Sequence, residues 1–290
     1  MATYHPQALL QGDEPGAWSA PTPITYTQRD VLLYAVGVGI SDLRFVFEAH
    51  PKFAVFPSFA VRWCGAGLAL DEKALPPSPG PMTIDAERYL EQLAPLPLAG
   101  TVQLRSRLLA VHPRGKGSAF VELESEVLDE AGQVCVRQQV GIFRRGVVAL
   151  GDIEPFQGQG SSRSERLAVP ERVADVNLAV PIAANQAHLY RLSGDYNPLH
   201  IDPDAARSGG FEAPILHGLC TYGHCAQALL GALADGDAAR FVSQRLRFSA
   251  PVFPGEALLI QAWHEGPGSA LFEVRVGERV VVNNARFCWR

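Results

Sequence analysis

The chain has little charge, few cysteines and no long apolar run. Only 19% of its 290 residues are charged and the net charge is -5, so nothing favours nucleic acid or an anionic membrane as a partner. The five cysteines are scattered, without a Cys-x-x-Cys pair, which predicts a reduced, cytoplasmic compartment. No stretch reaches the ~18 apolar residues of a membrane-spanning helix. The first residues lack the basic and apolar parts of a signal peptide.

What the chain does have is apolar material. Hydrophobic residues make up 47% of it, which supports a sizeable core and argues against disorder. The length allows roughly two domains of ~150 residues, or one large domain. Residues 158–172, GQGSSRSERLAVPER, are rich in Gly, Ser and charge and are typical of a linker. We therefore expect a first domain over 1–155, a linker over 156–172 and a second domain over 173–290.

The two expected domains resemble each other at a spacing of about 157 residues. In each, a segment with helical spacing of apolar residues carries a tyrosine. A proline follows 23 residues after Tyr34 and 24 residues after Tyr190. Thr27 and Asp30 have the spacing of a capping box at the start of the first helix. These landmarks are few, so a chance similarity between two α+β halves stays open at this point.

Each half ends in segments that alternate like strands and are separated by glycine-containing turns. They cover residues 101–112, 118–130 and 134–146 in the first half, and 239–249, 256–265, 270–278 and 279–289 in the second. Val121, Leu123 and Val127 alternate with three glutamates, which predicts a sheet with one buried and one solvent-exposed face. We expect two units, each a helix on an antiparallel sheet, that together resemble a dimer within one chain.

The most informative segment runs from Tyr190 to Gly218, YRLSGDYNPLHIDPDAARSGGFEAPILHG. It places Asp195 and His200 five residues apart on a turn that Pro198 stiffens. A carboxylate and an imidazole held together can bind one water and move its protons. A backbone amide at the start of a helix can hold an oxyanion nearby. These are the parts needed to add water to an unsaturated thioester, or to remove it.

The run Y-R-L-S-G-D-Y-N-P-L-H-I-D, followed by P-I-L-H-G-L-C-T-Y-G, resembles the hydratase-2 motif of the MaoC-like dehydratase family. The first-half run YAVGVGISDLRFVFEAHPKFAVFPSFAV is similar to the N-terminal half of the double hot-dog type-2 enoyl-CoA hydratases. The resemblance extends from about residue 22 to residue 290. It implies an α+β double hot-dog fold, in which two tandem units each wrap an antiparallel sheet around a central helix. It also implies that the first half is a degenerate unit that shapes the acyl pocket.

The resemblance further implies the activity and the site. The activity is (R)-specific hydration of trans-2-enoyl-CoA to (R)-3-hydroxyacyl-CoA and the reverse dehydration, in fatty-acid β-oxidation or related acyl-CoA metabolism. Asp195 and His200 are then the catalytic pair, Asn197 orients the water or the imidazole, and the Gly218 amide forms the oxyanion hole. The first half has Gly39 in place of Asp195, so we expect one active site per chain. Residues 83–100 match the family pattern only in part, which leaves the acyl-chain preference open.

The expected ligands follow from the same reading. Arg245 and Arg247 are candidates for binding CoA phosphates, with solvated strand arginines as the alternative. We expect no cofactor, since CoA is part of the substrate, and an acyl-CoA thioester as the partner, with a homodimer left open. His200, Asp202 and Asp204 cluster in the sequence, but their loop contains a proline and the spacing suggests no fourth ligand, so we expect no metal.

Two other functions stay open at this stage. The hot-dog architecture also hosts acyl-CoA thioesterases, and a non-catalytic acyl-binding protein could share it, although the retained acid-base pair argues against the latter. A nucleophilic pairing of Cys220 or Cys225 with His217 or His224 is a weaker alternative, because cysteine is often buried as a small hydrophobe. The sequence leaves open the acyl-chain length and the choice between CoA and an acyl-carrier protein.

Overall fold

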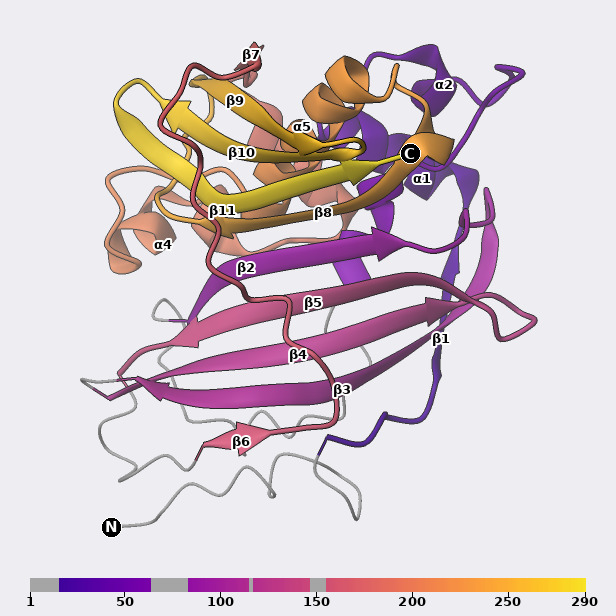
Figure 1. The fold of residues 1–290 in the computed structure, drawn as a ribbon, viewed down its shortest axis with the longest axis horizontal. Coiled ribbons are helices and arrows are strands. Elements are labelled where there is room, and N and C mark those ends of the chain that lie inside the picture. Colours follow the sequence, from indigo (N-terminus) through magenta and orange to yellow (C-terminus); the bar gives the residue numbers. More distant parts are fainter. Residues whose placement is uncertain (1–15, 64–82, 115–116, 147–154) are drawn as a thin grey trace.

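A computed structural model describes residues 16–63, 83–114, 117–146 and 155–290 (Figure 1). In this part of the chain, eleven strands form one sheet in the order β1-β3-β4-β5-β2-β8-β11-β10-β9-β7, with the short β6 paired to β3. All of the strand pairings are antiparallel. None of the helices in these ranges is long and apolar enough to cross a membrane.

The strands divide between the two halves of the chain. The first half supplies β1 (Thr22–Tyr26), β2 (Thr83–Gln92), β3 (Gly100–Arg114), β4 (Ser118–Leu128), β5 (Val134–Arg144) and β6 (Phe156–Gln157). The second half supplies β7 (Val176–Pro181), β8 (Phe241–Phe248), β9 (Ala257–Gly266), β10 (Ser269–Val276) and β11 (Arg279–Trp289).

The strand order reads as two copies of one unit joined back to back. Outward from the central β2–β8 pair, β5, β4, β3 and β1 on one side correspond to β11, β10, β9 and β7 on the other. In the central pair Tyr89 lies opposite Arg245, 156 residues further along the chain, which is also the spacing of Tyr34 and Tyr190. An antiparallel pair whose facing residues are equivalent lies on a two-fold axis. The predicted internal repeat is therefore a pseudo-two-fold axis in space.

The helices cover one face of this sheet. In the second half, α5 (Gly218–Leu233) is the central helix, and it lies behind the strands of that half in Figure 1. In the first half, α1 (Gln28–Gly37), α2 (Leu43–Val46) and the 3-10 helix η2 (Pro57–Trp63) are described. The capping box predicted at α1 is confirmed, since the Thr27 N–H donates to the Asp30 carboxylate at 2.8 Å. The rings of Tyr34 and Tyr190 are fully buried and contact each other edge-on, 6.2 Å between centroids.

The structure confirms the predicted α+β double hot-dog and each of the strands predicted from alternation. It adds four strands that the sequence did not predict, β1, β2, β6 and β7. Of these, β2 (residues 83–92) joins the two sheets. β2 carries charged side chains at several positions because its neighbours supply counter-charges. Arg247 of β8 donates to the Glu87 carboxylate at 2.7 Å, for example. Residues 83–92 form a strand because they pair with β8 of the other half. The local sequence pattern does not show this pairing.

The prediction of a solvent-exposed face on residues 118–130 is wrong. Every residue of β4 is buried, and Glu122, Glu124 and Glu126 are each only 4% exposed. Arg107 on the neighbouring β3 donates to Glu124 at 2.7 Å, and Arg137 on β5 donates to Glu126 at 3.0 Å. These cross-strand ion pairs cover the carboxylates, which explains how a strand with three glutamates can lie inside a sheet.

The segment predicted as a linker also covers the face of the sheet that carries these glutamates. After β6 it runs across the front of the sheet to β7 (Figure 1). The Ser162 hydroxyl donates to Glu122, the Gln139 amide donates to the Ser161 carbonyl at 3.0 Å, and Asn284 of β11 donates to the Glu165 carbonyl at 2.7 Å. Residues 156–172 therefore lie against strands of both halves. The domain boundaries themselves stay a prediction.

The packing of α5 against the first half can be tested at a glycine. A Cβ atom on Gly223 would lie 2.5 Å from Val38 Cγ1, whereas a Cβ on Gly231 of the same helix would meet nothing within 4 Å. We expect Gly223→Ala to lower the free energy of unfolding by about 1–3 kcal/mol, since the clash must be relieved in a packed core. Gly231→Ala, the matched control, should be neutral or stabilising because alanine favours helix. Urea unfolding measures both, and equal midpoints for the two variants would contradict the packing.

Candidate active site

The turn that carries the predicted pair is fixed by local hydrogen bonds. It follows α3 (Gln186–Tyr190) and the 3-10 helix η5 (Arg191–Ser193), where Gly194 adopts φ +120°, a conformation that favours glycine. Asn197 then caps the 3-10 helix η6 (Pro198–His200), accepting from the Leu199 N–H at 3.0 Å. The Asn197 N–H donates to the Asp195 carboxylate at 3.2 Å. Asn197 thus shapes the turn through its side-chain oxygen.

His200 is held in one orientation and one neutral tautomer. Its side chain is 8% exposed, and its Nδ1 lies 2.9 Å from the Ile215 carbonyl oxygen. Because a carbonyl only accepts, Nδ1 must carry the hydrogen, which leaves a lone pair on Nε2. Burial lowers the pKa of His200 below its ordinary value, and this outweighs the opposing effects of the Ile215 hydrogen bond and of Asp195. The imidazole is therefore poised to accept a proton at neutral pH.

A third side chain, His217, joins the pair, and the sequence did not predict this role. Its ring stacks on that of His200, with centroids 3.8 Å apart and planes 27° apart. Its Nε2 donates to the Asp195 carbonyl oxygen at 3.2 Å, so His217 ties the turn to the start of α5. Burial and the neighbouring His200 lower the pKa of His217 to about 4. The feature of the sequence that could have indicated this role is the position of His217 directly before Gly218.

The pair opens into a cavity of about 420 Å³ that both halves of the chain line. The second half supplies Asp195, Asn197, His200, residues before and at the start of α5, and residues 248–252 after β8. The first half supplies the start of β2, Arg88 and Arg145. The walls are mixed: apolar side chains such as Leu199 and Phe248 stand beside these polar groups. Such a cavity suits a ligand with an apolar chain and a polar reacting end.

Gly218 lies at the lining of this cavity as the first residue of α5. The helix's own bonds begin with the N–H groups of Cys220 and Thr221, which donate to the His217 carbonyl, so the Gly218 N–H is not used by the helix. A Cβ here would lie 3.2 Å from the Phe248 ring. Glycine therefore allows close approach at a helix N-terminus, where partial positive charge favours an oxyanion.

Arg245 and Arg247 do not line this cavity. Arg245 is 6% exposed and donates to the Glu165 carbonyl at 2.9 Å, and Arg247 pairs with Glu87 across the β2–β8 junction. Both arginines have structural partners, and their binding of CoA stays a prediction. The arginines that do line the cavity are Arg88, which donates to Asp85 at 2.9 Å, and the exposed Arg145 directly after β5.

The structure does not bring together the three residues that were considered as metal ligands, His200, Asp202 and Asp204. Asp202 caps the short helix α4 (Pro203–Ser208) and Asp204 pairs with Arg207, so neither faces His200 as a ligand. A different trio, the side chains of Asp195, His200 and His217, brings its ligand atoms within 4.8 Å of one another and could hold a cation. In each imidazole, the hydrogen on one ring nitrogen is donated to a carbonyl oxygen, so one nitrogen per ring is left for any ligand.

The cysteine alternative has no support in the geometry. Cys220 Sγ lies 3.6 Å from His224 Nδ1, but both side chains are buried and neither lines the cavity. Burial raises the pKa of Cys220 well above its ordinary value, so the thiolate needed for nucleophilic attack is disfavoured.

Two family profiles match the chain, one for each half. The profile described as "MFE-2 hydratase 2 N-terminal domain" matches residues 24–146, and that described as "MaoC like domain" matches residues 166–285. The solved structure of a MaoC-like dehydratase from Phytophthora capsici superposes with a TM-score of 0.80 at 38% identity, covering 95% of this chain and 96% of that one.

Curated relatives agree. The chain is 38% identical to 3-hydroxyacyl-thioester dehydratase Y of Mycobacterium tuberculosis, with 90% of each chain covered. It is also 38% identical to peroxisomal multifunctional enzyme type 2 of Mus musculus, but it spans only 36% of that protein's length while 90% of this chain is covered. The alignment covers 90% of the mycobacterial dehydratase and 96% of the Phytophthora structure at 38% identity, which shows the family. The chain belongs to the MaoC-like dehydratase family, as a double hot-dog member.

Proposed function

We propose that the chain catalyses the (R)-specific hydration of trans-2-enoyl-CoA to (R)-3-hydroxyacyl-CoA and the reverse dehydration. The observation that carries the proposal is the geometry of one site. The side chains of Asp195 and His200 lie within 4.8 Å of each other at a cavity of about 420 Å³ that the start of α5 also lines. A relative named as a 3-hydroxyacyl-thioester dehydratase supports the substrate class.

The groups divide the chemistry between them. Asp195 and His200 Nε2 hold one water beside the C2–C3 double bond, and Nε2 accepts its proton while the oxygen bonds to C3. Negative charge moves to the thioester oxygen, where the Gly218 N–H meets it. The imidazolium, stabilised by the Asp195 carboxylate, then returns the proton to C2. One water is added in total, and both of its parts arrive from the same side of the alkene.

The setting of the enzyme is part of the proposal. Among the described residues, Cys135, Cys220, Cys225 and Cys288 are free thiols, which supports a reducing, cytoplasmic compartment. We propose an acyl-CoA of fatty-acid metabolism as the substrate, no cofactor besides, and a homodimer as the assembly to test by light scattering.

The direct test is the loss of enoyl-thioester ultraviolet absorbance when the protein is added to crotonyl-CoA and longer enoyl-CoAs. Asp195→Asn and His200→Gln should each lower kcat/KM by roughly 10²–10⁴-fold, because each removes a proton-handling group. Asp204→Asn is the matched control: it lies on the same loop but pairs with Arg207 on the surface, and it should keep full activity. Full activity in Asp195→Asn would remove the mechanism.

The same assay separates the competing functions. A hydratase leaves CoA attached, whereas a thioesterase releases a free thiol that a chromogenic reagent detects. A non-catalytic binding protein turns over no enoyl thioester. Thiol release that matches the loss of absorbance would replace hydration by thioester cleavage as the function.

The pH profile tests the role of His200. A neutral imidazole is required, so activity is full above the pKa of His200 and is lost as the pH falls through it. Because burial lowers this pKa below the ordinary value of a histidine, the midpoint of the fall in kcat/KM should lie at a lower pH than the pKa of a free imidazole, about 6.5. Nitrogen-15 NMR at pH 7 should show hydrogen on Nδ1 of His200 and not on Nε2. Hydrogen on Nε2 would contradict its role as the base.

Arg145 is the arginine we expect to meet the CoA moiety. It is exposed and lines the cavity that holds Asp195. Its guanidinium can therefore bind a phosphate at the cavity without leaving the protein core. Arg145→Gln should raise KM for crotonyl-CoA roughly tenfold, the loss of one charged contact, with kcat nearly unchanged. The control, Arg114→Gln, changes another exposed arginine at the end of β3 and should leave KM as it is. A fall in kcat at constant KM would exclude this role.

A further inference from the structure

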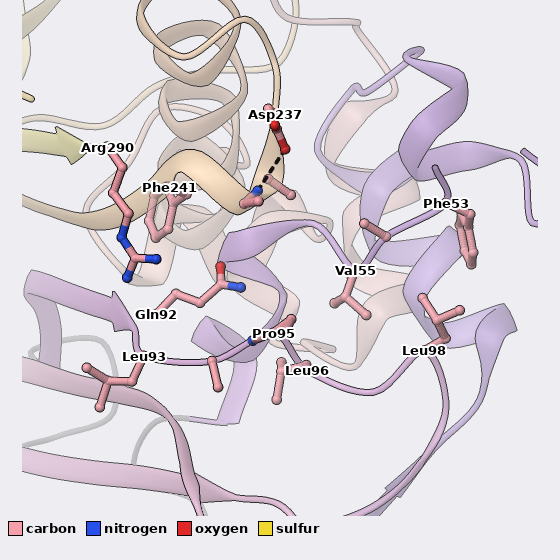
Figure 2. A pocket seen from close by; sticks show the side chains of 14 residues that line it. Phe53, Val55, Gln92, Leu93, Pro95, Leu96, Leu98, Asp237, Phe241 and Arg290 are labelled. Carbon is pink, nitrogen blue, oxygen red and sulfur yellow. Dashed lines mark hydrogen bonds between the residues drawn. The ribbon is translucent and has the colours of Figure 1, made fainter. Parts of the chain in front are cut away.

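A second cavity, of about 390 Å³, lies at the other end of the β2–β8 pair (Figure 2). β2 reaches both cavities: its residues 83–85 and Arg88 line the catalytic cavity, and Gln92 lines the second one. The second cavity is lined by residues 53–55 before η2, by residues 92–96 at and after the end of β2, and by residues 237–239 and Phe241 before and at the start of β8. The catalytic cavity is lined by the equivalent segments with the halves exchanged. The second cavity is therefore the pseudo-two-fold mate of the catalytic one, and we call it the mate cavity.

In the described part of the chain, the mate cavity has no equivalent of the acid-base pair. Counting by the same spacing of 156 residues, Gly39 stands in place of Asp195 and Arg44 in place of His200. Arg44 donates to the Asp42 carboxylate at 3.0 Å and to the Asp235 carbonyl at 3.2 Å. A ligand in the mate cavity would therefore be bound without being converted.

The walls of the mate cavity are mostly apolar. Figure 2 shows Val55, Leu93, Leu96, Leu98 and Phe241 among the side chains that line it. Leu93 is 41% exposed and Leu98 is 38% exposed, so both side chains are accessible to a ligand. The volume lies at the lower end of the range of small-molecule pockets, ~300–1,000 Å³. It fits a single aliphatic chain.

One cation stands at the edge of these walls. Arg290 follows β11 as Arg145 follows β5, so each cavity has an arginine from the equivalent strand end. Hydrogen bonds of 2.8 Å between Arg290 and Arg240 fix its main chain. In the described ranges no carboxylate pairs with the Arg290 guanidinium, and the buried side-chain oxygen of Gln92 has no hydrogen-bond partner either. The mate cavity thus offers unsatisfied polar groups beside its apolar walls.

Among the residues that the structure describes, Asp237 is the one carboxylate that lines the mate cavity, and it already accepts a hydrogen bond. Its Oδ1 accepts from the Ala239 N–H at 2.9 Å as the cap of the 3-10 helix η7 (Ala238–Arg240). Its charge also acts on Arg44, whose pKa is raised first by Asp42 and in smaller part by Asp237. Arg290 and Asp237 bring opposite charges to the lining, and of the two it is the Arg290 guanidinium that can pair with an anionic ligand.

We propose that the mate cavity binds an unbranched fatty carboxylate of medium chain length. The chain lies between Val55, Leu96 and Phe241, and the carboxylate pairs with Arg290. One guanidinium matches one anionic head group such as a carboxylate. This site goes beyond the proposed activity and does not depend on it, since binding here involves no turnover.

Equilibrium dialysis of the full chain against radiolabelled decanoate tests the proposal, with acetate as the short-chain comparison. Decanoate should bind and acetate should not. Arg290→Gln should weaken decanoate binding roughly tenfold, the loss of one charged contact. Leu98→Asp should weaken it as well, and this substitution is at a partly exposed position that folding tolerates. Arg29→Gln is the control, because Arg29 is exposed and lines neither cavity. This substitution should leave decanoate binding unchanged.

The sign of the charge effect gives a second arm. Asp237→Asn keeps the helix cap, because asparagine caps as well as aspartate, but it removes a negative charge from the lining. Decanoate should then bind at least as tightly as to the wild type. Binding that is unchanged in both Arg290→Gln and Leu98→Asp would overturn the proposal, since decanoate would then occupy another site. Binding weakened by Asp237→Asn would overturn the anionic ligand.

Discussion

The pairing of β2 with β8 is the interaction on which the rest of the structure depends. It joins two hot-dog sheets into one and places the pseudo-two-fold axis between them, at Tyr89 and Arg245. Each end of this strand pair then contributes to a cavity with walls from both halves of the chain. The second half supplies the acid-base pair, but it does not build the cavity alone. The first half is thus a structural partner of the active site, whatever chemistry it has lost.

Within the active site, two carbonyl groups decide the protonation of two histidines. The Ile215 carbonyl takes the hydrogen on His200 Nδ1, and the Asp195 carbonyl takes the hydrogen on His217 Nε2. The stacked rings therefore present opposite tautomers, and burial keeps both neutral by lowering their pKa values. This arrangement leaves the lone pair of His200 Nε2 available for a water proton. The backbone, and not a second acidic side chain, sets up the base.

The sequence predicted what depends on local pattern or on a long motif. Alternation located the strands, and the motif located Asp195, His200 and Gly218, which the structure brings to one cavity. It did not predict β2, because its charged residues are compensated by strands distant in the chain. The buried glutamates of β4 were misjudged for the same reason. Arg145 was not singled out as a cation beside the cavity, since only the folded sheet shows which arginines stand at a strand end.

The asymmetry of the two halves has a steric cause that works against a second catalytic turn. Gly39 adopts φ +75°, and a Cβ there would lie 2.8 Å from His224 Nε2 on α5. An aspartate at this position would therefore strain the backbone and collide with the central helix of the other half. The ion pair of Arg44 with Asp42 occupies the rest of the turn. Once α5 packed this closely on the first half, catalysis at the mate cavity could not return by one substitution, whereas a binding cavity with a free guanidinium could persist.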